Sequence, residues 1–437
     1  MRIPFVRMTC LPIGLLALVW MFLPEQASAQ KLTREERKII ELVEAQREDA
    51  IRFLERAVNV NSGTLNPGGV KQVGSLFSQE FDKLGFETRW IDLQQANRAG
   101  HVFAVRKGNR GKRLLLIGHI DTVFESDSPF QRFVRTGDTA AGPGVSDMKG
   151  GDVVILYALR ALHEAGVLDG AGITVALIGD EEKPGQPLSL VRGDLIEAAR
   201  NSDAALCFEG SVGPNNATIA RRGSSSWMLQ VKGKAGHSGR IFSDTYGFGA
   251  IFEAARIIDS FREELFGEEY LVFNPGVILG GTEVSYDSEK AKGDAFGKTN
   301  VIPQTVTVHG GIRCISDEQQ ERARARMREI VGRNLPRTSA EISFTDGYPA
   351  MSPTEGNKSL LRLYDQVARD LGHGAITPLD PAERGAADIS FVAPYIDALS
   401  GLGPVGTGAH SVEEELHLPS VAVATQRAAL LIYRLTR

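Results

Sequence analysis

The chain has 437 residues, of which 42% are hydrophobic and 24% charged, and its formal net charge at pH 7 is −5. These fractions are typical of a folded globular protein, and this length predicts more than one domain. Because the net charge is slightly acidic, the composition gives no sign of a basic surface for a nucleic-acid backbone, and we expect no DNA or RNA partner.

The first 29 residues have the organisation of a secretory signal. Arg2 and Arg7 precede an apolar stretch over 11–23, and a small-residue Ala-Ser-Ala cleavage site ends at Ala29. The apolar stretch is shorter than the about 20 residues of a membrane-spanning helix, which disfavours a stable membrane anchor. We therefore expect a secreted, periplasmic protein whose mature chain begins at Gln30, which N-terminal sequencing would test.

Helices and strands are predicted to alternate through the first part of the mature chain, 30–222. Apolar residues at helical spacing predict one helix over 32–58 and a second that ends at Gly85. Apolar runs then predict strands over 86–93, 101–108, 113–121, 172–182 and 203–210, with helices over 147–166 and after Arg192. Unbroken apolar strands between helices indicate an α/β domain with a mostly parallel sheet that carries helices on both faces.

The pattern changes at residue 223. Strands are predicted over 224–239, 270–281, 304–315 and 340–348, with helices over 248–265 and 317–333. This order is a strand-helix-strand-strand-helix-strand unit, so we expect an inserted α+β, ferredoxin-like domain over 223–342. Helices over 359–371 and 421–435 then predict that 343–437 completes the first, α/β domain.

Side chains that commonly bind metal ions stand where four segments of the α/β domain end their apolar runs. They are His119, Asp121, Asp147, Glu181, Glu182 and Glu209. In an open α/β sheet, such strand ends face the crevice where ligands bind. Singly, each has an ordinary structural explanation, such as helix capping by Asp147. Their recurrence, with His410 in a glycine-rich loop, instead favours a site for two Zn²⁺ ions that share a carboxylate.

Seven motifs between residues 118 and 415 carry a resemblance to a known family. They read GHIDTV, GPGVSDMKGG, GDEE, CFEG, GKAGHSG, TNVIP and GTGAHSVEE. Together they resemble the dizinc exopeptidases and deacylases, a family that includes glutamate carboxypeptidase, aminoacylase, acetylornithine deacetylase and succinyl-diaminopimelate desuccinylase. The resemblance implies two zinc ions per subunit, and it implies that the inserted domain is a lid that also joins two subunits in a homodimer.

The resemblance also assigns a role to each candidate ligand. His119 and Glu209 look like ligands of one zinc ion, and Glu182 and His410 look like ligands of the second. Asp147 resembles the carboxylate that bridges both ions. Asp121 would accept the other ring N–H of His119, and Glu181 would be the general base.

Three residues of the predicted insert resemble substrate contacts. His237 in GKAGHSG is similar to a lid histidine that reaches the active site of the other subunit, where it stabilises the oxyanion. Asn300 in TNVIP and Arg313 in HGGIRCI resemble lid residues that contact the substrate, and a guanidinium suits capture of a free carboxylate. The sequence departs from the family pattern at Gly311, where an acidic residue is usual, and this bears on Arg313 more than on the metal site.

These observations together predict a secreted, zinc-dependent metallocarboxypeptidase. In this family a glutamate at the position of Glu209 accompanies carboxypeptidases and deacylases, whereas aspartate accompanies several aminopeptidases. We therefore expect hydrolysis of the amide bond to a C-terminal amino acid, with a small peptide or N-acyl amino acid as substrate. An N-acyl-amino-acid deacylase with the same site is the near alternative. A family member that has lost catalysis is disfavoured by the complete ligand set.

Overall fold

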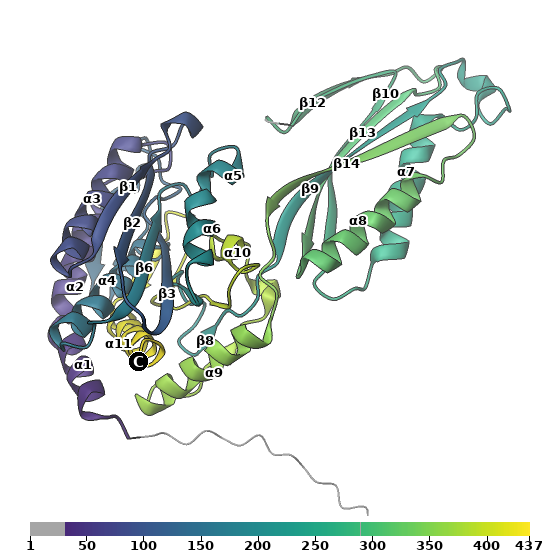
Figure 1. Cartoon of the computed structure of the whole chain (residues 1–437). Helices are drawn as coiled ribbons and strands as arrows, with labels where there is room; N and C mark the ends of the chain where they lie inside the picture. Colours follow the sequence, from purple (N-terminus) through teal and green to yellow (C-terminus); the bar gives the residue numbers. More distant parts are fainter. Residues whose placement is uncertain (1–30, 289) are drawn as a thin grey trace, which may run out of the picture.

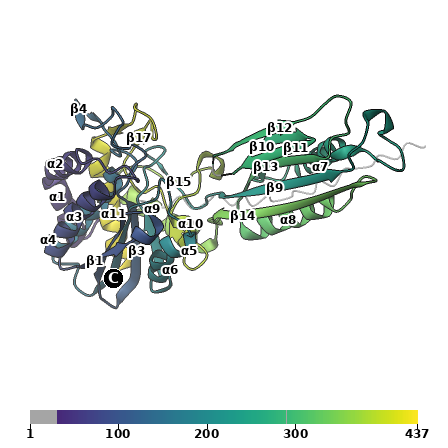
Figure 2. The same cartoon turned by 90° about the horizontal axis from the view of Figure 1, so that it is seen from above.

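The computed structural model describes residues 31–288 and 290–437, so the expected signal peptide lies outside the described residues. These residues form two lobes, which Figures 1 and 2 show from the side and from above. The chain enters the second lobe through β9 (Gly223–Gly233) and leaves it through β14 (Thr338–Tyr348). Within the described ranges, no helix has the length and apolar character needed to cross a membrane.

The first lobe is built on a six-stranded sheet with the order β1-β2-β6-β3-β7-β16. Its strands are β1 (Glu87–Asp92), β2 (Gly100–Arg106), β3 (Arg110–His119), β6 (Ala171–Ile178), β7 (Ala204–Cys207) and β16 (Ala398–Leu399). The last four pair in parallel, whereas β1 pairs with β2, and β2 with β6, in antiparallel fashion. The sheet is therefore mixed, because residues 93–99 between β1 and β2 are too few for the crossover of about a dozen residues that parallel strands need.

Helices cover both faces of this sheet, as expected for an α/β lobe. One face carries α3 (Pro67–Lys83), α4 (Lys149–Glu164), α9 (Glu355–Asp370) and α11 (Pro419–Leu435), and the other carries α6 (Gly193–Arg200) and α10 (Ile389–Val392). Alternate residues of β3 face opposite ways: Leu114 and Leu116 join the larger core, and Leu115 and Ile117 join the core beneath α6 and α10. This two-sided burial explains the unbroken apolar run in the sequence.

The predicted helix over 32–58 is wrong in one respect, because it is two helices. They are α1 (Arg34–Ala45) and α2 (Arg47–Val58), separated at Gln46. The amide of Gln46 donates to Glu164 Oε2 on α4 over 2.7 Å, which ties the break to the body of the lobe. In Figure 1, α1 lies beside α11, so both ends of the described chain are in the first lobe.

A small antiparallel sheet brings two distant segments together. Its order is β17-β18-β5-β4, with β4 (Val134–Thr136), β5 (Thr139–Ala141), β17 (Gly406–Thr407) and β18 (Glu415–His417). The loop that follows β5 leads to Asp147, and the turn between β17 and β18 contains His410. The pairing of β18 with β5 therefore places these two predicted ligands near each other.

The second lobe is a four-stranded antiparallel sheet with two helices on one face (Figure 2). Its order is β10-β13-β9-β14, with β10 (Val272–Gly281) and β13 (Thr305–Cys314), and its helices are α7 (Gly249–Leu265) and α8 (Asp317–Val331). A hairpin of β11 (Glu283–Asp287) and β12 (Lys292–Phe296) was absent from the sequence prediction. The last strand ends at Tyr348, where the predicted strand over 340–348 also ends.

The second lobe has its own hydrophobic core, centred on Trp227 of β9. The indole is 1% exposed, its ring meets Phe261 edge to face at 5.7 Å, and its Nε1 donates to Gly311 O over 3.2 Å. The residues of this cluster all fall between 227 and 331, separate from the clusters of the first lobe. Each lobe therefore buries its own apolar residues.

We predict that Trp227→Ala lowers the free energy of unfolding of the second lobe by about 3–5 kcal/mol, because it leaves a large cavity and an unpaired carbonyl. Thermal and urea unfolding, followed by proteolysis to identify the lobe that opens first, would measure this. Phe266→Ala is the matched control, since Phe266 is 83% exposed, and we expect it to change stability by less than about 0.5 kcal/mol. Equal destabilisation by both variants would contradict the assignment of a separate core.

Candidate functional site

Three neighbouring strands of the first lobe deliver predicted ligands to one edge of the sheet. His119 is the last residue of β3, Glu181 and Glu182 follow the end of β6 by a few residues, and Glu209 follows β7. Because β3 pairs in parallel with both β6 and β7, the carboxyl ends of these strands meet at the same edge. Asp147 reaches this edge from the loop before α4, and His410 from the β17–β18 turn.

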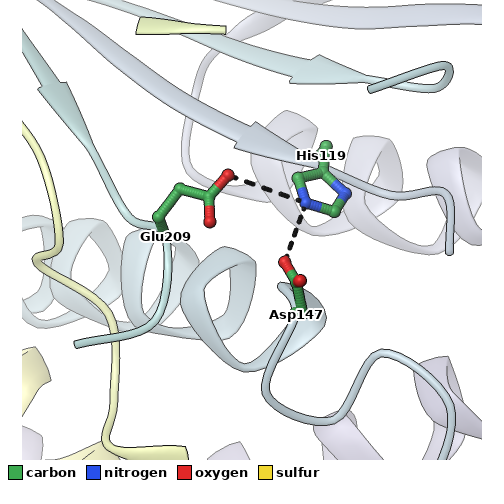
Figure 3. Close-up of side chains that lie close together, drawn as sticks. All are labelled: His119, Asp147 and Glu209. Carbon is green, nitrogen blue, oxygen red and sulfur yellow. Dashed lines mark hydrogen bonds and ion pairs between the residues drawn. The ribbon is translucent and has the colours of Figure 1, made fainter. Parts of the chain in front are cut away.

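The first group of possible metal ligands is His119, Asp147 and Glu209 (Figure 3). Nε2 of His119 lies 3.2 Å from Asp147 Oδ1 and 3.9 Å from Glu209 Oε1. His119 and Glu209 are buried, so this half of the site is enclosed by protein. In Figure 3 both carboxylates point toward the same ring nitrogen.

The second group is Asp147, Glu182 and His410. Nε2 of His410 lies 3.1 Å from Asp147 Oδ2 and 3.1 Å from Glu182 Oε2. The side chain of His410 is 60% exposed, so this half of the site opens to solvent. Asp147 thus directs one oxygen to each histidine, which is the arrangement a bridging carboxylate requires.

The donor set fits a pair of divalent cations. Within each group the ligand atoms lie within 4.8 Å of one another, and together they comprise two imidazoles and three carboxylates. Hydrogen bonds to Asp147 and Glu182 raise the pKa of His410 to about 11. Burial alone would lower the pKa of His119, but bonds with Asp121 and Asp147 raise it well above its ordinary value. The carboxylates therefore attract positive charge, and imidazole with carboxylate ligands suits Zn²⁺.

Asp121 connects the first histidine to the loop after β6. Its Oδ1 lies 3.5 Å from Nδ1 of His119 and accepts the Glu181 N–H over 3.0 Å, while its Oδ2 accepts the Glu182 N–H over 3.1 Å. The Thr64 hydroxyl also donates to Oδ2, over 2.6 Å. Burial opposes ionisation of Asp121, but the interactions with His119 and these donors prevail and lower its pKa. One buried carboxylate thus orients three residues of the site.

Glu181 directly precedes the ligand Glu182 in the chain and interacts with His119 and Glu209 as well. Burial raises its pKa well above the ordinary value, His119 partly offsets this, and the charges of Asp388, Glu209 and Glu182 raise it further. A raised pKa makes a carboxylate a better proton acceptor, as general-base catalysis requires. Its main-chain carbonyl accepts a hydrogen bond from Tyr348 Oη over 3.1 Å.

Two buried groups that support the site were missed in the sequence. Glu414 accepts three main-chain N–H groups, from Gly144 (2.9 Å), Ser146 (2.7 Å) and Asp147 (2.9 Å), and burial raises its pKa to about 7. It therefore holds the loop that presents the bridging carboxylate. The acidic run after His410 was the available signal, but nothing in the run distinguishes the buried member.

The second missed group is Arg192, which is fully buried between two acidic residues. Its Nη1 donates to Asp180 Oδ1 over 2.5 Å and its Nε donates to Asp388 Oδ1 over 2.7 Å. Its Nη2 also donates to the main-chain carbonyl of Asp180, over 3.2 Å. Because Asp180 immediately precedes Glu181, this ion-pair network supports the loop that carries Glu181 and Glu182.

The three predicted substrate contacts of the second lobe do not come together. Asn300 O accepts the N–H of Ser238 over 2.9 Å, next to His237, so these two candidates are neighbours beyond the far end of β9. Arg313 lies at the opposite end of the sheet, paired with Ser224 at the start of β9. The eleven residues of β9 place His237 about 30 Å from the junction of the lobes.

A cation that the sequence prediction did not include lies beside the metal ligands. Arg384 is half-buried in the loop before α10, donates through Nη2 to Gly210 O, and is influenced electrostatically by Glu209 and Asp147. Its Nε is buried without a hydrogen-bond partner. No sequence motif marked it, because its approach to Glu209 depends on a loop about 170 residues further along the chain.

Curated relatives of the chain include hydrolases of two kinds. Carboxypeptidase G2 of Pseudomonas sp. (strain RS-16) is 30% identical over 376 residues, which cover 84% of each chain. Succinyl-diaminopimelate desuccinylase of Magnetococcus marinus is 24% identical over 382 residues, covering 82% of this chain and 92% of the relative.

Solved structures share the fold at lower identity. The aminopeptidase PepT of Bacillus cereus matches with a TM-score of 0.70 and 16% identity, covering 90% of this chain and 99% of that one. The YXEP protein of Bacillus subtilis, described as a dinuclear metal-binding peptidase, matches with a TM-score of 0.59 and 16% identity. The match covers 90% of this chain and 99% of that one.

Residues 115–434 match the family described as Peptidase family M20/M25/M40. That range contains both groups of metal ligands, Asp121 and Glu181. The chain is therefore a member of peptidase family M20/M25/M40, and a metallopeptidase or amidohydrolase by descent.

Proposed function

We propose that the protein is a secreted, periplasmic, zinc-dependent carboxypeptidase that releases a C-terminal amino acid from a small peptide or N-acyl conjugate. The observation that carries this proposal is the shared carboxylate of Asp147, which directs one oxygen to the His119 group and the other to the His410 group. Glu181 lies beside these groups with a raised pKa. This arrangement suits hydrolysis of an amide by water.

In this proposal, His119, Asp147, Glu182, Glu209 and His410 hold two zinc ions. The ions would supply Lewis-acid activation of water and of the scissile carbonyl. The carboxylate of Glu181 takes the proton of the attacking water and returns it to the nitrogen of the leaving amine. Asp121 keeps the Glu181 and Glu182 amides and the ring of His119 in place during both transfers.

Recognition of the substrate carboxylate is proposed to involve Arg384. Its guanidinium is half-buried near Glu209 and Asp147, with Nη2 bound to Gly210 O, so a cation stands next to the predicted metal ligands. Arg313, the residue chosen from the sequence, lies on the second lobe beside the junction and is the alternative. A free α-carboxylate on the substrate is what both assignments have in common.

N-acyl-amino-acid deacylation is the second candidate function. The relatives at 24–26% identity include several succinyl-diaminopimelate desuccinylases, which act on an N-acyl group. The two reactions use the same hydrolytic groups and differ in what occupies the acyl side of the scissile bond. The 30% identity to carboxypeptidase G2 favours the peptidase.

A homodimer through the second lobe is part of the proposal. His237 and Asn300 lie beyond the far end of β9, too distant to serve the metal ligands of their own chain. Exposed apolar side chains gather near them at the start of α7 and on β10, an outer strand of the sheet: Phe242, Ile251, Phe252 and Ile278. The ring of Phe242 lies 5.4 Å from that of Phe252. We take this apolar patch as the surface that a second copy covers.

Hydrolysis should depend on metal and on Glu181. We expect the protein to release C-terminal amino acids from a panel of peptides and N-acyl amino acids, to lose this activity with a chelator, and to regain it with Zn²⁺. Glu181→Gln should lower kcat by about 100-fold to 10,000-fold and leave the bound zinc unchanged, because it removes only the proton acceptor. The control is Glu355→Gln, whose side chain is 79% exposed.

Full hydrolysis by Glu181→Gln, or purified protein that binds no transition metal, would contradict the proposed function. The panel also separates the two candidates. Cleavage of dipeptides and larger peptides supports the carboxypeptidase, whereas activity confined to N-acyl amino acids supports the deacylase.

Arg384→Ala should raise KM about 10-fold to 100-fold for substrates with a free C-terminal carboxylate, because a charge-assisted hydrogen bond is lost. Steady-state kinetics with free and C-terminally amidated forms of one substrate would measure this. Amidation of the substrate should raise KM for the wild-type enzyme, and it should change KM little for the Arg384→Ala variant. If Arg313→Ala instead shows this pattern and Arg384→Ala does not, carboxylate capture belongs to the second lobe.

Phe252→Glu should convert the dimer to a monomer, because it places a charge in the apolar patch, where the side chain of Phe252 is 51% exposed. Light scattering and sedimentation would measure the mass of the protein. Hydrolytic activity should fall when the dimer dissociates, because His237 of the other copy no longer reaches the site. Phe266→Glu is the control, since Phe266 lies at the other end of α7. A fully active wild-type monomer would contradict the dimer.

A further inference from the structure

The two strands that connect the lobes lie side by side at the junction. Arg221 and Met351 exchange main-chain hydrogen bonds, each 2.9 Å, and Ser224 of β9 pairs with Tyr348, the last residue of β14. A Cβ on Gly223 would approach the main chain of Ala350 to 2.8 Å, so the connecting strands are closely packed. Tyr348 therefore lies at the point where the second lobe joins the first.

The side chain of Tyr348 is directed to the first lobe by an irregularity in β14. The register between β14 and β9 shifts between Asp346 and Tyr348, so that Gly347 has no partner in the ladder. Such a bulge redirects the side chain that follows it. The ring of Tyr348 then lies 4.8 Å from Phe391 of α10, and its hydroxyl donates to Glu181 O over 3.1 Å.

This hydrogen bond completes the support of one peptide group. The peptide between Glu181 and Glu182 has its carbonyl bound by Tyr348 and its N–H bound by Asp121 Oδ2, over 3.1 Å. Its plane sets the directions in which the two glutamate side chains leave the main chain. One support belongs to the first lobe and the other to the final strand of the second lobe.

We propose that Tyr348 is a positioning residue, whose hydroxyl aligns Glu181 and Glu182 only when the two lobes adopt the angle that brings it to the carbonyl of Glu181. This inference rests on the proposed function, because it assigns a base and a metal ligand to these two residues. It adds a direct link between lobe orientation and the alignment of the hydrolytic groups.

Tyr348→Phe tests the inference, because it keeps the ring against Phe391 and removes only the hydroxyl. Calorimetric titration of Co²⁺ or Zn²⁺ into metal-free protein should show one of the two binding events weakened about tenfold, as for other losses of support to a metal ligand, with the second unchanged. This measurement needs no substrate. Tyr286→Phe is the matched control, since its hydroxyl lies 3.0 Å from His309 Nδ1 within the second lobe, and it should leave both events unchanged.

Kinetics provide the second measurement. Tyr348→Phe should lower kcat about fivefold to tenfold and change KM less than about twofold, because alignment of the base is lost while substrate contacts remain. In a Glu181→Gln background at saturating metal, removal of the hydroxyl should change the residual rate less than about twofold, since the aligned base is already absent and both metal sites are filled.

The outcomes separate this inference from the proposed function. The positioning role is overturned if Tyr348→Phe changes neither metal binding nor kcat. It is also overturned if loss of the hydroxyl lowers the rate equally in the wild-type and Glu181→Gln backgrounds. Either result leaves the enzyme assignment intact. Absence of metal binding and hydrolysis in the wild type would overturn the proposed function, and this inference with it.

Discussion

The carboxylate of Asp121 is the group on which the rest of the site depends. It is fully buried, and the ring of His119, the Thr64 hydroxyl and two main-chain N–H groups lie around its oxygens and lower its pKa. An unpaired charge at this depth would be strongly destabilising. The need to satisfy it therefore fixes the end of β3 and the loop after β6 relative to each other.

Three further buried carboxylates, Glu414, Asp180 and Asp388, support neighbouring loops in the same way. Glu414 gathers the N–H groups before Asp147, and Asp180 and Asp388 share the buried Arg192 behind Glu181. The loops that bear Asp147 and Glu182 are thus held by acids that belong to neither ligand group. Rigid support of this kind keeps negatively charged side chains close together despite their repulsion.

The sequence was informative where chemistry follows a local pattern. The end of an apolar strand predicted His119 and Asp121, and helical spacing predicted α3, α4, α7, α8, α9 and α11 within a few residues. The sequence pattern did not predict features that depend on contacts with residues far away in the chain. The break at Gln46 depends on a contact with α4, and the burial of Glu414 and the approach of Arg384 depend on loops far away in the chain. The antiparallel pairing of β1 with β2 depends on the short connection between them, and the apolar pattern of the strands carries no information on strand direction.

The insertion of the second lobe between β7 and β16 has a consequence for the order of folding. Residues 223–348 are contiguous, so the core around Trp227 can close as soon as that segment has been synthesised. The first lobe cannot finish then, because β16 and α11, which complete its sheet and cover its larger core, come from the last part of the chain. Its contacts between α1 and α11 join the two ends of the described sequence, which makes late closure of this lobe the slow, non-local step.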